Sequence, residues 1–256
     1  MKITNLVEQI FSIAVALDQN GGLKNTIYAL DDEIFILNYD HTVLLNFKLR
    51  KNEAPFSNPI AFKANDYDSN EFEEKDGQII FHSQLNGYVK QKRCGTVDLS
   101  PGEVKELFKK YKKDFDDKAE EVTLTKSILP LLEDGLSHIE FSGKKGEGMK
   151  LVQRNIYNGT IIEISKDQKG FFKDSLKDEF GPVGIKTSDF NALFQFQDEL
   201  KFMFPSEKSD DVIMVKSFND NKRSMTGFIA SCLYDELIEI RESKKDSQQS
   251  GFKRNK

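Results

Sequence analysis

Five lysines gather on one predicted helix and form the clearest candidate for a binding site in this sequence. The helix covers residues 101–113, and its Lys105, Lys109, Lys112 and Lys113 follow at spacings of four, three and one. Such spacings place side chains on one strip of an α-helix, with Lys110 beside it. A strip of cations opposite an apolar stripe attracts phosphate groups. We predict that these five lysines form a phosphate-binding strip, against the alternative of an ordinary solvated helix face.

Residues that commonly do catalytic or metal chemistry are scattered along the chain. The histidines are His41, His82 and His138, and none is followed at i+3 or i+4 by a His, Cys or carboxylate that would suggest metal ligation. Cys94 and Cys232 each stand alone, without a C-x-x-C pair. The sequence contains no G-x-S-x-G or H-E-x-x-H motif. We therefore predict no enzymatic activity, no catalytic residue, no metal and no cofactor.

Two loops look like binding motifs but fail in detail. The segment from Asp66 begins as D-x-D-x-N, like a calcium loop, but has Glu71 where the sixth-place glycine belongs and Gly77 where the bidentate glutamate belongs. We expect a solvated acidic loop. The glycine-rich segment 143–148 carries two lysines but leads into a predicted strand, whereas a phosphate-binding P-loop leads into a helix. A hairpin connection is the expected structure there.

Two helices have recognisable starts. In the first, residues 6–17 place apolar side chains on one face, and Asn5 with Glu8 reads as the capping pair. In the second, Ser100 precedes a proline at the first helical position, and Glu103 completes a capping box.

Short β-prone runs separate and follow these helices in two similar cycles. The expected strands cover residues 26–30, 34–37, 43–47, 60–63, 78–81, 87–93, 138–141, 149–152, 160–164, 200–204, 212–215 and 228–230. The last two should pair with each other across a turn at residues 219–221. This order predicts an α+β protein of two similar domains, each an antiparallel sheet backed by helices. We place the domains at residues 1–121 and 122–240.

The composition of the chain indicates the cellular compartment in which we expect the protein. The chain has 256 residues, 37 Lys and Arg against 42 Asp and Glu, and a net charge of −5. Two cysteines fit reduced thiols in a cytosolic protein. The sequence has neither a secretion signal nor a membrane span, so we expect a cytoplasmic location (a bacterial host cytoplasm for a viral protein) and no membrane partner. The tail, residues 241–256, has six basic and two acidic residues and is expected to be disordered.

This order of elements resembles the DNA sliding clamps, the polymerase processivity factors of the archaeal, eukaryotic and T4-like phage type. The resemblance implies a homotrimeric ring around double-stranded DNA, held through phosphates, with a DNA polymerase and a clamp loader as partners. It implies that basic helices line the central hole, here residues 6–17, 101–113, 127–132 and 189–196. It also implies that the lysines of the second of these helices are DNA-binding residues: Lys105, Lys109, Lys110, Lys112 and Lys113. Residues 190–204 followed by 212–215 form the most clamp-like stretch.

A ring of this kind joins its subunits through sheet edges, because an edge strand offers unpaired N–H and C=O groups. The candidate edges are residues 78–81 or 87–92 in one half and 149–152 or 160–164 in the other. Two other functions stay open. One is a β-rich binding or assembly protein, of viral type, without a DNA role. The other is a monomeric accessory protein that grips nucleic acid, with the basic tail as its contact.

Overall fold

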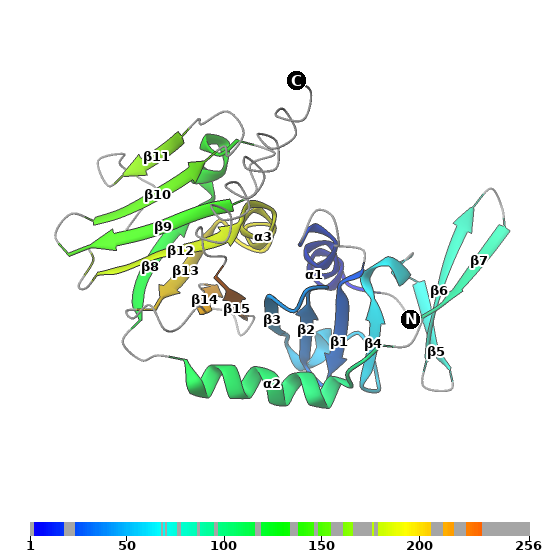
Figure 1. Cartoon of the computed structure of the whole chain (residues 1–256). Coiled ribbons are helices and arrows are strands. Elements are labelled where there is room, and N and C mark those ends of the chain that lie inside the picture. Colours follow the sequence, from blue (N-terminus) through cyan, green and yellow to red (C-terminus); the bar gives the residue numbers. More distant parts are fainter. Residues whose placement is uncertain are drawn as a thin grey trace, which may run out of the picture.

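In the computed structural model, the described residues form three antiparallel sheets and three α-helices (Figure 1). The structure describes residues 3–17, 24–67, 69, 71–75, 78–85, 88–94, 97–115, 119–133, 138–145, 148–154, 161–165, 176, 179–205, 212–217 and 224–231. The predicted disordered tail, residues 241–256, lies outside them. None of the helices within these residues is long and apolar enough to cross a membrane.

Among the described residues the central sheet has eight strands, four that precede α2 (Pro101–Asp114) in the chain and four that follow it, which we call the two halves. In spatial order they are β4 (Ile60–Lys63), β1 (Thr26–Leu30), β2 (Glu33–Leu37), β3 (Val43–Lys48), β15 (Ser224–Ala230), β14 (Val212–Ser217), β13 (Glu199–Phe204) and β8 (Glu120–Thr125). The two halves join where β3 pairs with β15, with Leu45 opposite Gly227. The predicted pairing of the last two strands is confirmed, since Val212 lies opposite Ala230.

Two smaller sheets flank the central one. The four-stranded sheet has the order β11 (Ile161–Ser165), β10 (Gly148–Arg154), β9 (His138–Lys144), β12 (Phe180–Lys186). The three-stranded sheet has the order β5 (Glu71–Lys75), β6 (Gln78–Leu85), β7 (Tyr88–Arg93), and extends away from the body in Figure 1. The prediction of a solvated acidic loop from Asp66 onward is therefore partly wrong, because residues 71–75 form a strand. The predicted hairpin across residues 143–148 is confirmed by β9 and β10.

The helices lie on both faces of the central sheet. They are α1 (Asn5–Ala16), α2 (Pro101–Asp114) and α3 (Thr187–Leu193), with short 3₁₀ turns η2 (Lys51–Glu53), η3 (Ala64–Asp66) and η4 (Lys126–Leu131). The expected helix at 127–132 is thus a 3₁₀ turn with Pro130 inside it. In Figure 1, α1 and α3 lie above the sheet and α2 lies below it.

The helix starts agree with the sequence to within one residue for α1 and α2. Ser100 caps α2, and the reciprocal bonds with Glu103 complete the predicted capping box. The cap of α1 is Thr4, whose hydroxyl accepts from the Val7 N–H, so the assignment to Asn5 was wrong by one residue. No side chain caps α3, which begins directly after β12, a strand that the sequence pattern did not reveal.

Aromatic side chains fill the core on the α1 and α3 side of the central sheet. In the first half, Phe11 of α1 meets Phe62 and Tyr67 edge to face, with ring centroids 5.5 Å and 5.1 Å away. In the second half, Phe190 of α3 packs against Phe194 and Phe202. Pairs of this kind contribute about 1 kcal/mol each beyond the burial of their area. The chain has no Trp, and its many Phe residues supply the large aromatic side chains of this core instead.

A buried asparagine ties α1 to the sheet. Asn25 is fully buried, and its amide donates to the carbonyls of Ala14 and Leu17 at 2.7 Å and 2.9 Å. Its side-chain oxygen accepts from the Tyr39 N–H at 2.7 Å. One side chain therefore satisfies the end of α1 and holds the turn between β2 and β3.

We expect Asn25→Ala to lower the free energy of unfolding by about 3 kcal/mol, because it leaves buried carbonyls and an N–H without partners. Asn25→Asp should also destabilise, since a carboxylate cannot donate to the two carbonyls. Urea unfolding measures both, with the exposed Asn5→Ala as control. Equal stability of all three variants would contradict this role.

Candidate functional site

Helix α2 lies on the face of the central sheet opposite α1 and α3. Its buried residues, Val104 and Phe108, belong to an apolar cluster with side chains from strands of both halves: Tyr28, Phe35, Leu37, Leu44, Met214 and Phe228. The buried apolar residues of α1 and α3 belong to the other, larger cluster, and these two helices contact each other. The expectation that α1, α2 and α3 line one common surface is therefore wrong.

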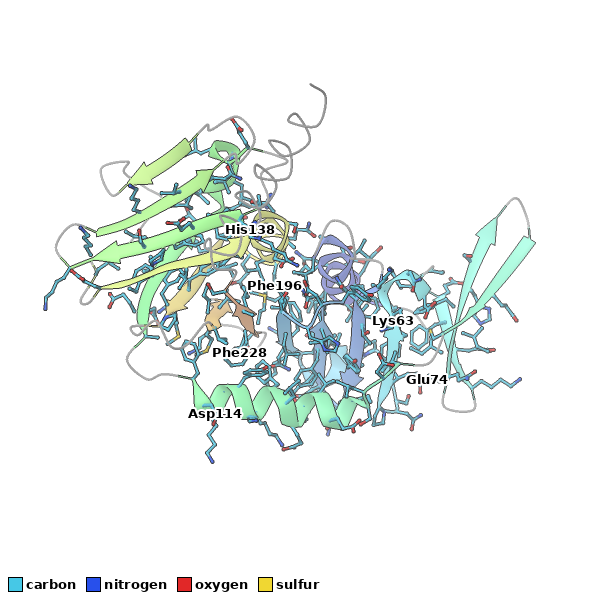
Figure 2. The ribbon with its side chains drawn as sticks, in the orientation of Figure 1. Lys63, Glu74, Asp114, His138, Phe196 and Phe228 are labelled. Carbon is cyan, nitrogen blue, oxygen red and sulfur yellow. The ribbon has the colours of Figure 1, made fainter. Side chains whose placement is uncertain are left out.

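Helix α2 bridges the junction between the two halves. The Phe108 ring packs against Phe35 of β2 and Phe228 of β15, with centroids 5.7 Å and 5.2 Å away. Tyr111 and Phe115 also contact Phe228, at 5.8 Å and 6.1 Å. Figure 2 shows Phe228 between the sheet and α2, close to the helix end marked by Asp114. The helix thus covers the seam where β3 meets β15.

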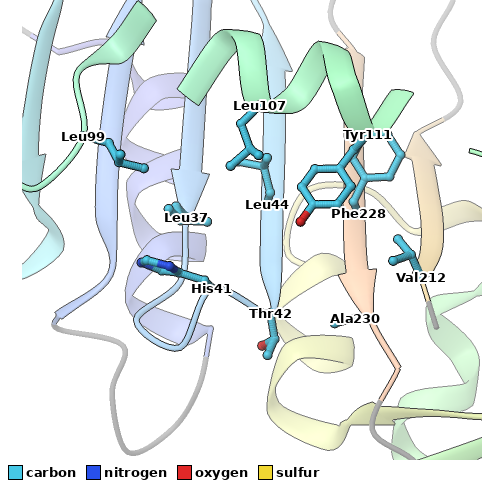
Figure 3. Close-up of a pocket in the computed structure, with 10 residues that line it drawn as sticks. All are labelled: Leu37, His41, Thr42, Leu44, Leu99, Leu107, Tyr111, Val212, Phe228 and Ala230. Atoms are coloured by element: carbon cyan, nitrogen blue, oxygen red, sulfur yellow. The ribbon is translucent and has the colours of Figure 1, made fainter. Parts of the chain in front are cut away.

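A pocket of about 160 Å³ opens beside α2, between the helix and the sheet (Figure 3). Its lining combines side chains of α2 with residues from both halves of the sheet: Leu37, His41, Thr42, Leu44, Leu99, Leu107, Tyr111, Val212, Phe228 and Ala230. An apolar cavity of roughly this volume holds a benzene-sized group. Tyr111 is 41% exposed and stands at the edge of the pocket, so the cavity is accessible from outside. No local sequence pattern predicts this pocket, because its lining residues come from segments far apart in the chain.

A strained turn shapes one wall of the pocket. His41 has a positive φ of 61°, uncommon for a residue other than glycine. Buried Asn38 holds this turn, since its side-chain oxygen accepts from the Val43 N–H at 2.7 Å and its amide donates to the Thr42 hydroxyl at 3.0 Å. The carbonyl of Asn38 also accepts from the His41 N–H. These hydrogen bonds fix the positions of His41 and Thr42 in the wall of the pocket.

The five predicted DNA-binding lysines have different surroundings. Lys105 is only 26% exposed and forms ion pairs with Glu33 at 2.6 Å and Asp31 at 3.7 Å. The hydrogen bond to Glu33 raises the pKa of Lys105. Lys109 pairs with Glu106 one turn away. Exposed Lys110, Lys112 and Lys113 form no ion pair with a described residue.

Lys105 therefore anchors α2 to the turn between β1 and β2, and its side chain is engaged within the fold. The other four predicted lysines are exposed, on the face opposite α1 and α3. Whether they contact DNA stays a prediction. Helices α1 and α3 themselves contain no Lys or Arg.

The remaining candidate groups do not form a reaction centre among the described residues. No cluster of His, Cys, Asp and Glu there could hold a metal ion. His82 lies 3.8 Å from Glu73, and burial, with nearby Lys186, lowers the pKa of His138. Cys94 is half-buried, and Cys232 lies outside the described residues.

Comparison with known proteins identifies the fold. No protein-family model matches the chain, and the search of curated proteins found no match. Among solved structures, the PCNA2–PCNA3 complex of Sulfolobus tokodaii has a TM-score of 0.55 at 12% identity, over 90% of this chain and 98% of that one. Proliferating cellular nuclear antigen (PCNA) of Entamoeba histolytica has a TM-score of 0.52 at 10% identity, over 89% and 95%.

The fold is therefore the α+β fold of the PCNA sliding clamps, with antiparallel sheets backed by helices, as predicted. The domain limits at residues 1–121 and 122–240 stay a prediction. The proposed boundary falls inside β8, which is itself part of the shared central sheet.

The ion pair at Lys105 provides a test of how α2 is held. We expect Lys105→Ala to lower the free energy of unfolding by up to about 1 kcal/mol, because the pair is partly exposed. In a double-mutant cycle with Glu33→Ala the two losses should be less than additive. Lys110→Ala is the control and should leave stability unchanged. Full additivity would show that the pair does not anchor α2.

Proposed function

We propose that this chain is a DNA sliding clamp, a ring-forming processivity factor that encircles duplex DNA and tethers a DNA polymerase. The observation that carries the proposal is the likeness to PCNA structures, which extends over 90% of the chain and almost the whole length of its neighbours. A fold hosts more than one function, so the proposal also needs an assembly edge and a tethering site.

Assembly has candidate edges at the two ends of the molecule. Of the two candidate strands in the first half, β7 lies at the edge of its sheet, whereas β6 is paired on both sides. Of the two in the second half, β11 lies at the edge of its sheet, whereas β10 is paired on both sides. We propose that β7 of one subunit pairs with β11 of the next and that three subunits close the ring. A ring of this kind needs a clamp loader as a further partner.

Tethering has a candidate site in the pocket beside α2. It is apolar, accessible and built from both halves of the chain, as a docking site for one anchoring side chain requires. Its position on the face opposite α1 and α3 leaves those two helices for the face toward DNA. In this arrangement a polymerase docks on one face while the duplex passes the other.

One observation favours a second function, a β-rich assembly protein without a DNA role. Helices α1 and α3 carry no Lys or Arg, so they add no cation for the phosphates of an encircled duplex. A clamp with such helices depends on ring topology for its hold on DNA. The second function needs no DNA contact at all, and a DNA experiment therefore separates the two.

Retention on DNA tests the clamp. Subunits assembled in the presence of nicked circular DNA and then cross-linked should stay with the DNA through gel filtration at high salt, because a closed ring cannot leave a circle. Cutting the circle should release them. Loss at high salt from circular and linear DNA alike would contradict encirclement and support the assembly protein.

The edge of β7 tests assembly. The Cys94 N–H bonds to Ile79 of β6, so in an antiparallel ladder the exposed Gln91, three residues earlier, directs its own N–H away from β6. Gln91→Pro removes one outward donor, which an edge strand tolerates. We expect sedimentation to show a mass three times 29.3 kDa for the native chain and for Gln91→Ala, and monomer for Gln91→Pro. A trimer of Gln91→Pro would exclude this edge.

A further inference from the structure

The α2 face of the central sheet carries a row of residues that crosses the junction of the two halves. In register the row runs from Phe35 of β2 through Asn46, Thr226 and Lys216 to Lys201 of β13. Its first-half end is apolar, since Phe35 packs against α2. Its second-half end carries two lysines on neighbouring strands. The row therefore changes from apolar to cationic as it crosses the junction.

The two lysines of this row lie directly opposite each other, a position where like charges destabilise a sheet. Met203 and Met214, two residues away on the same strands, pack with the α2 cluster, so alternation places both lysines on the α2 face. Lys201 forms an ion pair with Glu121 of β8. Lys216 is half-buried and forms no ion pair with a described residue. The sheet therefore keeps an unbalanced positive charge next to a second cation.

Two further lysines from other elements face the same region. Lys48 of β3 is exposed and lies opposite Ser224 of β15. Exposed Lys112 lies on the same flank of α2 as Lys105, because residues at i and i+7 share one face of a helix. Lys105 binds Glu33, which lies opposite Lys48 in the sheet, so this flank faces Lys48. Neither Lys48 nor Lys112 forms an ion pair with a described residue.

Helix geometry places Lys112 above the strand between the other two unpaired lysines. From Lys105 to Lys112 the helix advances about 10 Å, which is the width of two strand spacings, from β2 to β15. The carboxyl-terminal part of α2 does pack on Phe228 of β15. Strand β15 lies between β3, which carries Lys48, and β14, which carries Lys216. Three unpaired cations therefore surround one stretch of β15.

We propose that this surface binds an acidic segment of a partner protein, with Lys48, Lys112 and Lys216 as the contacts to its carboxylates. Ser224 and Thr226 are half-exposed on the stretch of β15 between these lysines, and their hydroxyls can donate to the same carboxylates. A bound carboxylate also offsets the repulsion within the row of lysines. None of these residues lines the pocket beside α2. The inference is therefore independent of both the ring and the tethering site.

Duplex DNA is another ligand that unpaired lysines attract. Helix α2 rests on the sheet and has a diameter of about 10 Å, so a rigid duplex that lies on the helix stays clear of half-buried Lys216. Single-stranded nucleic acid uses aromatic side chains for base stacking, and Ser224 and Thr226 offer none. A flexible carboxylate side chain does reach the corner between α2 and the sheet. The observations therefore favour an acidic protein segment.

Binding of labelled peptides to the full chain tests the inference by fluorescence anisotropy. The acidic probe is a short peptide in which Asp and Glu alternate with Ser, and the amide probe has Asn and Gln in their place. Neither probe has a large apolar side chain that could enter the pocket. We expect the acidic probe to bind at least about tenfold more tightly, through several exposed charge pairs together. Its affinity should fall as salt screens these pairs.

Charge reversal identifies the lysines responsible. The double variant Lys48→Glu with Lys216→Glu should remove the preference for the acidic probe. A glutamate at position 216 faces Lys201, so it replaces a like-charge pair by an opposite-charge pair, and the fold should tolerate it. The control, Lys75→Glu with Lys145→Glu, changes the net charge equally at exposed positions on β5 and beside β9, and should keep the preference. Thermal unfolding checks that both variants are folded.

Three outcomes would overturn the inference. One is equal binding of the two probes by the native chain. Another is a preference for the acidic probe that survives in the folded Lys48→Glu, Lys216→Glu variant, because the charge selection would then lie elsewhere. The third is displacement of the acidic probe by duplex DNA that binds the native chain but not this variant, which would assign the surface to nucleic acid. None of these measurements requires a ring, so a failure of the proposed function is distinguishable from each.

Discussion

The pairing of β3 with β15 is the constraint on which the rest of the structure depends. It joins strands that are far apart in sequence into one eight-stranded sheet, and every helix packs on that sheet. The contact is close enough to require glycine at its centre. A Cβ on Gly227 would lie 2.4 Å from Leu45 Cδ2 and 2.9 Å from Val215 Cγ1, where no real Cβ fits without displacement of its neighbours.

Side-chain alternation on this sheet separates two faces that pack against different helices. Along β15, Gly227 faces the cluster shared with α1 and α3, and Phe228 faces α2. The α2 face collects an apolar pocket and exposed lysines, and the helices of the opposite face carry no Lys or Arg. The chemistry for binding a partner therefore concentrates on one side of the sheet, whichever of the two proposed functions the chain has.

Helix α2 connects the two halves and also forms part of the candidate site. Phe108 contacts aromatic rings from both halves, while Leu107 and Tyr111, one turn apart, reach the pocket. A change in how α2 seats on the seam would therefore alter the pocket too. The ion pair of Lys105 with Glu33 and the capping box at Ser100 fix the amino-terminal part of this helix.

Local sequence determined where most helices and strands form, and tertiary structure decided which faces of the sheet they cover. The capping box at Ser100, the apolar stripe through Val104 and Phe108, and most strand positions were predictable, because each depends on neighbouring residues. An apolar stripe indicates which side of a helix is buried, but it does not indicate against which face of a sheet. The placement of α2 opposite α1 and α3, and with it the pocket, follows from the pairing of β3 with β15. That pairing joins segments separated by most of the chain, and local periodicity carries no information about it.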